Sequence, residues 1–270
     1  DYTLPTIKRV FLAGAPVHPL LLKRIQAIIP NGTAFTPYGA TEALPIAYIS
    51  AKEVLNETYK LTLQGKGTCV GHPIDGVKIR IIPIKDEVLN ELPKELPLGE
   101  IGEIVVCAPY ISKRYLNDLS ATAKAKINHQ GEIWHRMGDL GYKDTQGRLW
   151  FCGRKAERVV CENRIFYTDC CEAVFNAHES VFRSALIAYN VKDKKIPAII
   201  IEPKMKLSHT GKIQLLQQLR TLANTTETTK TIQHFAIYYK FPVDVRHNAK
   251  IHRLTLMRYF NEHPQKVYKI

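Results

Sequence analysis

Ten residues near the start of the chain read Thr36-Pro37-Tyr38-Gly39-Ala40-Thr41-Glu42-Ala43-Leu44-Pro45. The five residues from Tyr38 to Glu42 combine an aromatic ring, a glycine turn, a hydroxyl and a carboxylate. A nucleotide site uses these groups: a ring stacks on the base, glycine lets a ligand approach the backbone, and the oxygens meet a phosphate and Mg²⁺. A turn with an exposed glutamate is the alternative, and this stretch alone leaves both open.

The residues around this stretch predict a piece of an α/β sheet. Residues 8–13 form a short apolar run typical of a strand, and residues 19–29 carry apolar side chains at helical spacing. A further short strand near 34–35 leads into the Tyr38 motif. Because one or two strands do not make a stable sheet, the first fifty residues are expected to belong to a larger one.

Two further patterns follow along the chain, one before and one after residue 153. Short β runs at 77–82 and 102–107, separated by Gly and Pro, predict a small antiparallel subdomain. Residues 154–270 predict a compact α+β unit, so we expect domains at 1–153 and 154–270. The elements expected in the second domain are a hairpin near 157–167, helices at 169–178, 211–223 and from 251, and strands near 182–189, 197–202 and 232–239.

Composition and charge narrow the class of protein. The 270 residues include 38 Lys and Arg and 25 Asp and Glu, for a net charge of +13, and 45% are apolar, which is typical of a globular protein. Residues 1–153 carry a net charge of +3 and residues 154–270 a net charge of +10. This excess is compatible with nucleic acid, an anionic membrane or a phosphorylated substrate. No apolar run reaches the roughly 18 residues of a transmembrane helix, and no secretory signal is visible.

The six cysteines predict a reduced, cytoplasmic protein without a zinc site. None of them forms a C-x-x-C pair, and the adjacent Cys170 and Cys171 are poorly placed for a structural disulfide. We expect ordinary buried thiols.

A second polar motif lies at the end of the first expected domain. Gly138-Asp139 is followed by Gly153-Arg154. A carboxylate can accept both hydroxyls of a ribose, and an arginine can reach the same sugar or its phosphate. The alternative is a hairpin turn with a surface arginine. Taken alone, Gly138-Asp139 and Gly153-Arg154 favour this alternative.

Order and spacing change this balance, because a whole series of motifs resembles the adenylate-forming superfamily of acyl- and aryl-CoA synthetases, luciferases and peptide synthetase adenylation domains. The series is Ala13-Gly14-Ala15, Tyr38 to Glu42, Gly71-His72-Pro73-Ile74-Asp75-Gly76, Gly99 to Ile104, Tyr115-Leu116-Asn117-Asp118, Gly138-Asp139 and Gly153-Arg154. The resemblance implies the C-terminal part of a large α/β adenylation domain with a small antiparallel β subdomain. A small mobile α+β lid would follow, with a hinge near 154–156.

The resemblance also implies ATP and Mg²⁺ as cofactors and gives the motif residues roles. Ala13, Gly14, Ala15 and Tyr38, with the neighbouring Gly39, would hold adenine, Thr41 would meet the α-phosphate, Glu42 would bind Mg²⁺, and Asp139 and Arg154 would bind ribose. The superfamily's Gly-rich phosphate loop, expected upstream of Tyr38, does not occur here. We therefore expect the C-terminal half of an enzyme roughly twice as long, which is inactive without its N-terminal half.

Two lysines compete for the catalytic role in a family motif that reads approximately S-G-K-I-x-R. Lys212 follows His209-Thr210-Gly211, which matches better by eye, but it lies only 58 residues after Arg154. Lys250, in Asn248-Ala249-Lys250-Ile251-His252-Arg253, lies 96 residues after Arg154, near the end of the chain. The family's spacing favours Lys250, and the alternative for Lys212 is a solvated residue at a helix start.

Within the superfamily, residues 241–251 and 171–178 look like the β-lactone synthetases of bacterial olefin biosynthesis. The resemblance implies adenylation of a long-chain 3-hydroxy acid, whose own hydroxyl then closes a β-lactone and displaces AMP. His247 or His252 could be the base for that step, or each could be a surface residue. Glu162 stands where CoA-using members usually have glycine, which argues against CoA.

Two other functions remain as alternatives. A long-chain acyl-CoA or acyl-AMP ligase would share the superfamily and give a thioester or a free adenylate. A non-catalytic basic module would bind nucleic acid or an acidic carrier protein, but the basic residues are scattered, without interleaved aromatics, so nucleic acid is not the expected partner.

Overall fold

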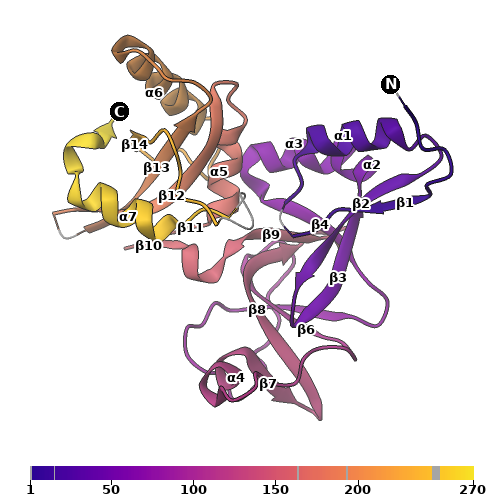
Figure 1. The fold of residues 1–270 in the computed structure, drawn as a ribbon. Helices are drawn as coiled ribbons and strands as arrows, with labels where there is room; N and C mark the ends of the chain where they lie inside the picture. The colour runs from indigo at the N-terminus through magenta and orange to yellow at the C-terminus, as the bar shows by residue number, and fades with distance from the viewer. Residues whose placement is uncertain (1, 15, 163, 193, 245–249) are drawn as a thin grey trace. The chain divides into compact units, whose positions relative to one another are not determined.

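The computed structural model describes residues 2–14, 16–162, 164–192, 194–244 and 250–270. The chain divides into two compact units (Figure 1). The first consists of residues 1–59 and 68–155, and the second of residues 60–67 and 156–270. The division lies two residues beyond the expected boundary, and the inclusion of 60–67 in the second unit was not predicted from the sequence.

The first unit is built on one continuous strand path. Within the described residues, eight strands follow the order β1-β2-β3-β4-β9-β8-β6-β5, and a ninth, β7, pairs with β8 off this path. β1 and β2 are parallel, and the other pairs are antiparallel. The predicted α/β piece and antiparallel subdomain are therefore joined through β3, β4 and β9. The strands are β1 (Arg9–Phe11), β2 (Thr33–Ala40), β3 (Ala43–Ser50), β4 (Thr68–Pro73), β5 (Lys78–Ile82), β6 (Gly102–Cys107), β7 (Lys126–His129), β8 (Glu132–Lys143) and β9 (Leu149–Arg154).

Local capping explains where the first helices begin. α1 (Pro19–Ile28) has proline at its start, where the missing N–H costs nothing, and it buries Leu22 against Ala34 of β2. Ser50 and Glu53 form a capping box that begins a helical segment the sequence analysis did not predict. This segment comprises α2 (Ala51–Glu53), η1 (Val54–Thr58), α3 (Tyr59–Leu61) and η2 (Thr62–Lys66), and the later helical elements are α4 (Leu119–Ala125) and η3 (Lys155–Glu157).

The second unit has the α+β pattern predicted from the sequence. Its larger sheet follows the order β12-β13-β14-β15, with β13 and β14 parallel, and a separate hairpin joins β10 to β11. The strands are β10 (Val159–Cys161), β11 (Arg164–Phe166), β12 (Val181–Val191), β13 (Lys194–Pro203), β14 (His234–Ile237) and β15 (Tyr268–Lys269). The helices are α5 (Thr168–Asn176), α6 (His209–Ala223), α7 (Arg253–Glu262) and the short η4 (Pro264–Lys266).

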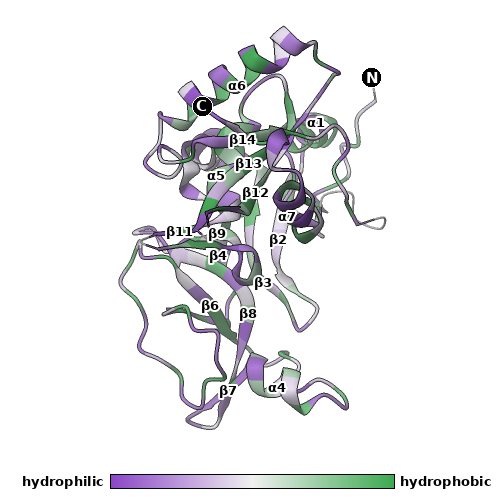
Figure 2. Ribbon diagram, turned by 90° about the vertical axis from the view of Figure 1, so that its left-hand side faces the viewer, coloured by the Kyte–Doolittle hydropathy of each residue, from purple (hydrophilic) through white to green (hydrophobic). Residues whose placement is uncertain are grey.

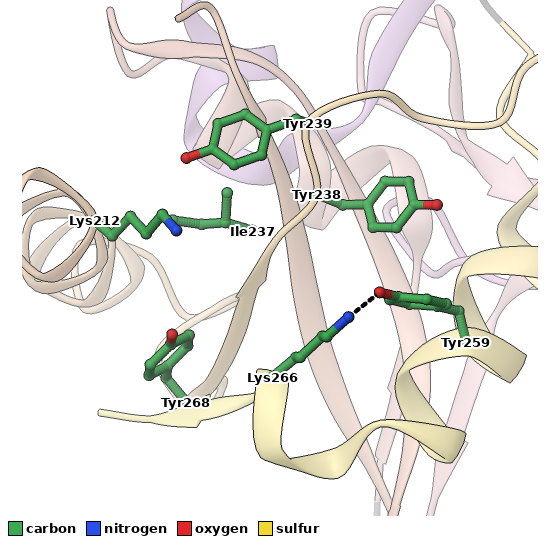
Figure 3. A pocket seen from close by; sticks show the side chains of 7 residues that line it. All are labelled: Lys212, Ile237, Tyr238, Tyr239, Tyr259, Lys266 and Tyr268. Atoms are coloured by element: carbon green, nitrogen blue, oxygen red, sulfur yellow. Dashed lines mark hydrogen bonds between the residues drawn. The ribbon is translucent and has the colours of Figure 1, made fainter. Parts of the chain in front are cut away.

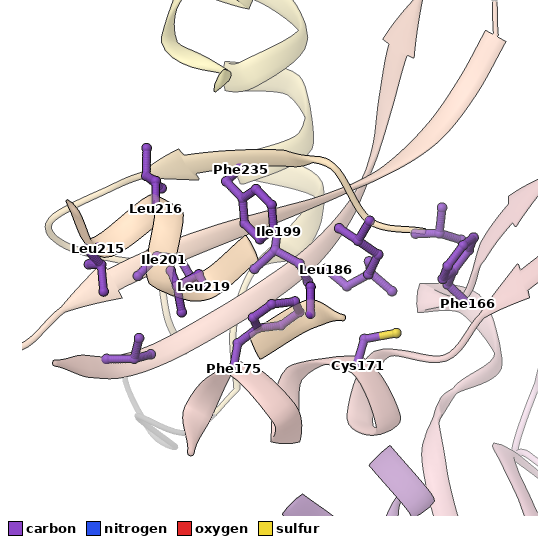
Figure 4. Close-up of a cluster of buried hydrophobic side chains, with 14 residues drawn as sticks. Phe166, Cys171, Phe175, Leu186, Ile199, Ile201, Leu215, Leu216, Leu219 and Phe235 are labelled. Atoms are coloured by element: carbon purple, nitrogen blue, oxygen red, sulfur yellow. The ribbon is translucent and has the colours of Figure 1, made fainter. Parts of the chain in front are cut away.

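Apolar side chains from helices and strands form the core of the second unit. Phe175 of α5 and Phe235 of β14 meet edge to face, with ring centroids 5.8 Å apart (Figure 4). Leu219 of α6 joins this cluster, whereas Phe260 of α7 packs with Ile187 in a second cluster. Helices thus bury apolar side chains on both faces of the β12–β15 sheet.

Helix α6 shows how the apolar periodicity works in detail. Hydrophilic and hydrophobic residues alternate along it in Figure 2, and Ser208 caps its start by accepting a hydrogen bond from the Gly211 amide. The sequence predicts an inward face of Leu216, Leu219 and Leu222. The structure buries Leu215 with Leu216 and Leu219 and leaves Leu222 at the margin of the face, because a helix returns after 3.6 residues rather than three.

Two negative expectations can be compared with the described chain. All six cysteines lie in it, none of them in a disulfide, and five of them are buried. Burial raises the pKa of Cys69 to about 11, so this thiol is protonated at neutral pH. None of the helices among the described residues combines the length and apolar character needed to cross a bilayer.

Candidate functional site

A carboxylate of the first unit joins two of the motifs singled out in the sequence. The Tyr38 hydroxyl in β2 donates a hydrogen bond to Asp139 Oδ2 in β8 at 2.6 Å, although the two residues are 101 positions apart. Burial and the neighbouring Asp139 carboxylate raise the pKa of Tyr38 well above its ordinary value. The phenol therefore stays protonated and serves as the donor.

Arg154 contacts the other oxygen of the same carboxylate. It ends β9 directly opposite Asp139 in the β8–β9 register, and its Nη1 lies 2.8 Å from Asp139 Oδ1. The same nitrogen donates to the Met137 carbonyl oxygen at 3.3 Å. Asp139 is 4% exposed, whereas the Arg154 side chain is 53% exposed. A buried carboxylate is thus oriented from both sides, and an accessible guanidinium lies beside it.

Two neighbours of Tyr38 differ from expectation: Phe151 was not among the predicted site residues, and Gly39 was expected to let a ligand approach the backbone. The Phe151 ring lies 6.2 Å from the Tyr38 ring, centroid to centroid. Gly39 has no room for a side chain, because a Cβ there would lie 2.5 Å from the Ala43 carbonyl oxygen and 2.7 Å from Leu44 Cδ1. The close approach that requires glycine is therefore that of the β2–β3 hairpin itself.

Glu42 lies in the turn between β2 and β3, and it has a partner far along the chain. The Tyr115 hydroxyl donates to Glu42 Oε1 at 2.7 Å, and the Glu42 carbonyl oxygen accepts from the Ser112 amide at 2.9 Å. The hydrogen bond from Tyr115 lowers the pKa of Glu42, and burial together with that bond raises the pKa of Tyr115 to about 12. Glu42 is therefore an anion at neutral pH, and the neighbouring Thr41 is exposed.

Cationic and neutral groups surround the Glu42–Tyr115 pair. Lys126 lies 6.0 Å from the Tyr115 ring centroid and donates to the Ser112 hydroxyl at 3.2 Å. Burial lowers the pKa of Lys126. Burial and the nearby Lys126 charge lower the pKa of His135 to about 4, so this imidazole is neutral at pH 7. The sequence motifs include Tyr115 but assign it no function, and they do not include Lys126. Neither residue lies near Glu42 in the sequence.

Removing the Tyr115 hydroxyl tests its hold on Glu42. In Tyr115→Phe, we expect the pKa of Glu42 to rise toward its ordinary value and the chain to lose about 1 kcal/mol of stability at pH 7. Since the folded-state pKa of Glu42 is depressed, this loss should shrink as the pH falls through that pKa. The measurement is a pH titration of the Glu42 carboxyl by ¹³C NMR, combined with urea unfolding.

A nearby tyrosine provides the matched control. Tyr110 donates its hydroxyl to the Pro45 carbonyl oxygen rather than to a carboxylate. Tyr110→Phe should leave the pKa of Glu42 in place. An unchanged Glu42 pKa in Tyr115→Phe would show that the hydrogen bond does not control this carboxylate.

The small-residue motif lies in the turn after β1. Ala13 and Gly14 are exposed, and Gly14 has a φ of 102°, a left-handed conformation that favours glycine. Ala15 lies outside the described residues. Among the described residues, no hydrogen bond or ring contact links Ala13 or Gly14 to Tyr38.

The two candidate lysines lie at different places in the second unit. Lys250 is exposed, and its carbonyl oxygen accepts from the Asp244 amide at 2.9 Å. The residues before it, including His247, Asn248 and Ala249, lie outside the described residues. His252 is exposed and occupies the N-cap position of α7 without a capping hydrogen bond from its side chain, and Lys212 lies in the first turn of α6.

The end of the Lys250 motif is held by a charged cluster that the sequence did not reveal. The Arg253 guanidinium donates two hydrogen bonds to Glu172 of α5, at 3.0 and 2.6 Å, and a third to Glu157 at 2.9 Å. Glu172 also accepts from the Leu186 amide at 2.8 Å. Such charge-assisted, two-pronged bonds fix the start of α7 firmly to α5.

Known proteins are similar to this chain in sequence. Residues 1–116 match the family described as AMP-binding enzyme. An olefin beta-lactone synthetase of Stenotrophomonas maltophilia is 42% identical over 261 residues, which are 94% of this chain and 47% of that protein. A second one, of Xanthomonas campestris pv. campestris, is 39% identical over the same shares. The chain thus spans about half the length of the curated relatives it matches.

Solved structures agree on the fold, at lower identity. An amide bond synthetase from Marinactinospora thermotolerans matches with a TM-score of 0.72 and 22% identity, over 94% of this chain and 47% of that one. An o-succinylbenzoate CoA synthetase from Bacillus subtilis matches with a TM-score of 0.71 and 22% identity, over the same shares. The α/β plus α+β architecture predicted from the sequence is confirmed. Residues 1–116 thus belong to the AMP-binding enzyme family, and the similarity to two olefin beta-lactone synthetases extends over 94% of the chain.

Proposed function

We propose that the chain forms part of an AMP-forming synthetase that activates a long-chain 3-hydroxy carboxylic acid with ATP and closes the acyl-adenylate to a β-lactone. The observation that carries the proposal is the contact of Tyr38 and Arg154 with the single carboxylate of Asp139, at 2.6 and 2.8 Å. The motifs of Tyr38, Asp139 and Arg154, to which the resemblance assigns contacts with ATP, therefore meet at the Asp139 carboxylate. The identity of 42% and 39% to two olefin beta-lactone synthetases supports the lactone product.

The nucleotide would lie against the first unit. The Tyr38 ring would stack on adenine, together with the backbone of Ala13, Gly14 and Ala15, and Thr41 would meet the α-phosphate. Because the Tyr38 hydroxyl is engaged by Asp139, the ring face is what the base would meet. Asp139 and Arg154 would take the ribose, one as an acceptor and the other as a donor. Gly39 supports this site indirectly, by permitting the hairpin.

Glu42 is the residue that would hold Mg²⁺. Among the described residues, no three His, Cys, Asp or Glu side chains form a ready metal cluster. This suits Mg²⁺, which keeps several waters and is usually bound by one or two carboxylates together with substrate phosphates. A solved structure of the o-succinylbenzoate CoA synthetase is described as a complex with ATP and magnesium ion. When bound, Mg²⁺ would offset the negative charge of the phosphates.

Lys250 would supply the positive charge for the first step. Both reactants are anions, because a carboxylate attacks the α-phosphate of ATP and pyrophosphate leaves. A fixed ammonium group that contacts the reacting oxygens lowers the cost of bringing them together. The spacing of 96 residues after Arg154 supports Lys250 over Lys212, and the second unit's net positive charge suits anionic reactants.

The second step would need no thiol. The 3-hydroxyl oxygen bonds to the acyl carbon, the bond from that carbon to the AMP oxygen breaks, and the hydroxyl proton passes to a base. His252 is exposed and close in sequence to Lys250, which makes it a candidate. A cytoplasmic location would suit the six cysteines, which form no disulfide among the described residues.

An acyl-CoA or acyl-AMP ligase is the second candidate. A putative acyl-CoA ligase of Bacillus subtilis is 32% identical over 150 residues, which supports it. Against CoA stands Glu162, next to the β10–β11 turn, where CoA-using members usually have glycine. Its carboxylate lies 3.2 Å from the Lys194 ammonium group.

A chimeric enzyme tests the proposal by its product. Residues 1–270 replace the matching region of the Stenotrophomonas maltophilia synthetase, and the chimera receives a long-chain 3-hydroxy acid, ATP and Mg²⁺. We expect a β-lactone and AMP in equal amounts, with no effect of added CoA. The chimera with Asp139→Asn should need at least tenfold more ATP for half-maximal rate, because a neutral amide is a weaker acceptor.

The chimera also separates the two candidates. An acyl thioester formed only with CoA, or a released adenylate without lactone, would support the ligase instead. A folded chimera that consumes no ATP would contradict both, and circular dichroism checks its folding.

A further inference from the structure

A cavity of about 360 Å³ lies within the second unit, between the start of α6, the end of β14 and the last elements of the chain (Figure 3). This volume lies within the range of roughly 300–1,000 Å³ typical of small-ligand sites. No role described above uses it. Besides Ile237, the cavity is lined by two lysines and four tyrosines, namely Lys212, Lys266, Tyr238, Tyr239, Tyr259 and Tyr268.

Both lysines of this cavity lack a counter-charge within the described residues. Lys212 lies in the first turn of α6, where a cation is unfavourable because the helix dipole is positive there. Its ammonium nitrogen lies 5.7 Å from the centroid of the Tyr239 ring. Lys266 lies 4.7 Å from the Tyr259 ring centroid and donates to the Tyr259 hydroxyl. No acidic residue lines the cavity. A cavity that is lined by two ammonium groups and no carboxylate is suited to bind an anion.

The tyrosines supply flat aromatic faces beside this charge. Tyr239 is 39% exposed and Tyr268 is 42% exposed. In Figure 3 their rings lie above and below the end of the Lys212 side chain. Exposed aromatic rings next to basic groups stack on nucleobases while the cations meet the phosphate.

The far wall of the cavity packs against other aromatic side chains of the second unit. The Tyr238 ring packs edge to face on Tyr259 at 5.2 Å and on Phe260 at 5.9 Å. Tyr268 is placed by the β14–β15 register, in which it pairs with the buried Phe235. A preformed wall lowers the cost of ordering side chains on binding.

We propose that this cavity binds a nucleoside phosphate, with the base against Tyr239 and Tyr268 and the phosphate at Lys212 and Lys266. The site is separate from the Asp139 carboxylate and its neighbours, because every lining residue belongs to the second unit. It gives a binding role to Lys212, the lysine that the proposed function does not use. The inference stands whether or not the chain forms a β-lactone.

Calorimetry on the 270-residue chain tests the site, with AMP, adenosine and inorganic phosphate as separate probes. The chain carries Asp139→Ala, which disables the candidate nucleotide site of the first unit. We expect AMP to bind at least tenfold more tightly than adenosine or phosphate. The double variant Lys212→Ala/Lys266→Ala should weaken AMP binding at least tenfold, because both counter-charges are lost.

A control variant with the same loss of charge distinguishes binding in the cavity from attraction of AMP by the chain's overall positive charge. Lys195→Ala/Lys204→Ala removes the same two charges at exposed positions outside the cavity and should change AMP affinity less than twofold. In chains with ¹³C-labelled tyrosine, AMP should shift the ring signals of Tyr239 and Tyr268. Thermal unfolding checks that each variant folds.

Four results would overturn the inference. They are absence of AMP binding at millimolar concentration, equal affinity for AMP and phosphate, equal affinity for AMP and adenosine, and unchanged AMP affinity in a folded Lys212→Ala/Lys266→Ala variant. The second would mean a site for the anion alone, and the third a site for the ring alone.

Discussion

Replacing Lys250 by alanine in the chimera should lower the rate of adenylate formation by about 10³-fold or more. The carboxylate and the α-phosphate repel each other, and removing one preorganised positive group from such a reaction costs about 10²–10³ in rate even where others remain. Lys250 is exposed, so its loss should leave folding unchanged. Pyrophosphate release with saturating ATP and acid measures the rate, and thermal unfolding checks the fold.

Lys212→Ala is the matched control for Lys250→Ala. It removes the same charge from the same unit, at the residue that the motif H-T-G-K-I made the rival candidate. With saturating ATP, we expect its rate of pyrophosphate release to stay within about threefold of the unmodified chimera, because the cavity that Lys212 lines contains none of the residues proposed to contact the reacting groups. A normal rate in Lys250→Ala, or a collapse in Lys212→Ala alone, would reverse the assignment.

Replacing Glu103 by glutamine should cost about 3–5 kcal/mol of stability, because it leaves buried cations without a counter-charge. Glu103 is fully buried and accepts two hydrogen bonds from Arg136, at 3.0 and 2.7 Å, and two from Lys155, at 3.0 and 3.1 Å. Arg136 also donates to the Glu87 and Lys124 carbonyl oxygens. Both tryptophans, Trp134 and Trp150, lie in the first unit, so their fluorescence in urea reports its unfolding.

An exposed ion pair in the same unit provides the comparison. Glu95 lies 2.6 Å from the Lys143 ammonium group, and its side chain is 39% exposed. Glu95→Gln should cost less than about 1 kcal/mol, as surface pairs do. A loss below 1 kcal/mol for Glu103→Gln would mean that the buried cluster is not what holds β6 to β8.

The second unit could be predicted from the sequence because its elements are regular and its apolar residues follow their periods. Helix α6 begins at a Ser cap and repeats leucine at helical spacing, and β12 and β13 contain the apolar runs 185–189 and 196–201. The helical segment from Ala51 was missed, since its only start signal is the Ser50–Glu53 capping box and it continues through irregular π turns. The single strand path of the first unit was also missed, because long-range pairings such as β4 with β9 leave no local pattern.

The candidate site shows the same limit at the level of single residues. The motifs named Tyr38, Glu42, Asp139 and Arg154, but nothing in the sequence showed that Tyr38 donates to Asp139 rather than standing free. The Tyr115–Glu42 bond joins residues 73 positions apart and was likewise invisible. The cavity of the second unit assembles four tyrosines from three segments, so it emerges only once the end of β14, α7 and β15 are packed together.

Isotope transfer tests most directly whether the chain serves an adenylating enzyme. The chimera is given ATP and a 3-hydroxy acid with ¹⁸O in both carboxylate oxygens, and the products are examined by mass spectrometry. If the carboxylate attacks the α-phosphate and the hydroxyl then displaces AMP, the AMP phosphate gains one ¹⁸O and the lactone keeps the other in its carbonyl group. Unlabelled AMP, or label in ADP or inorganic phosphate, would contradict adenylation.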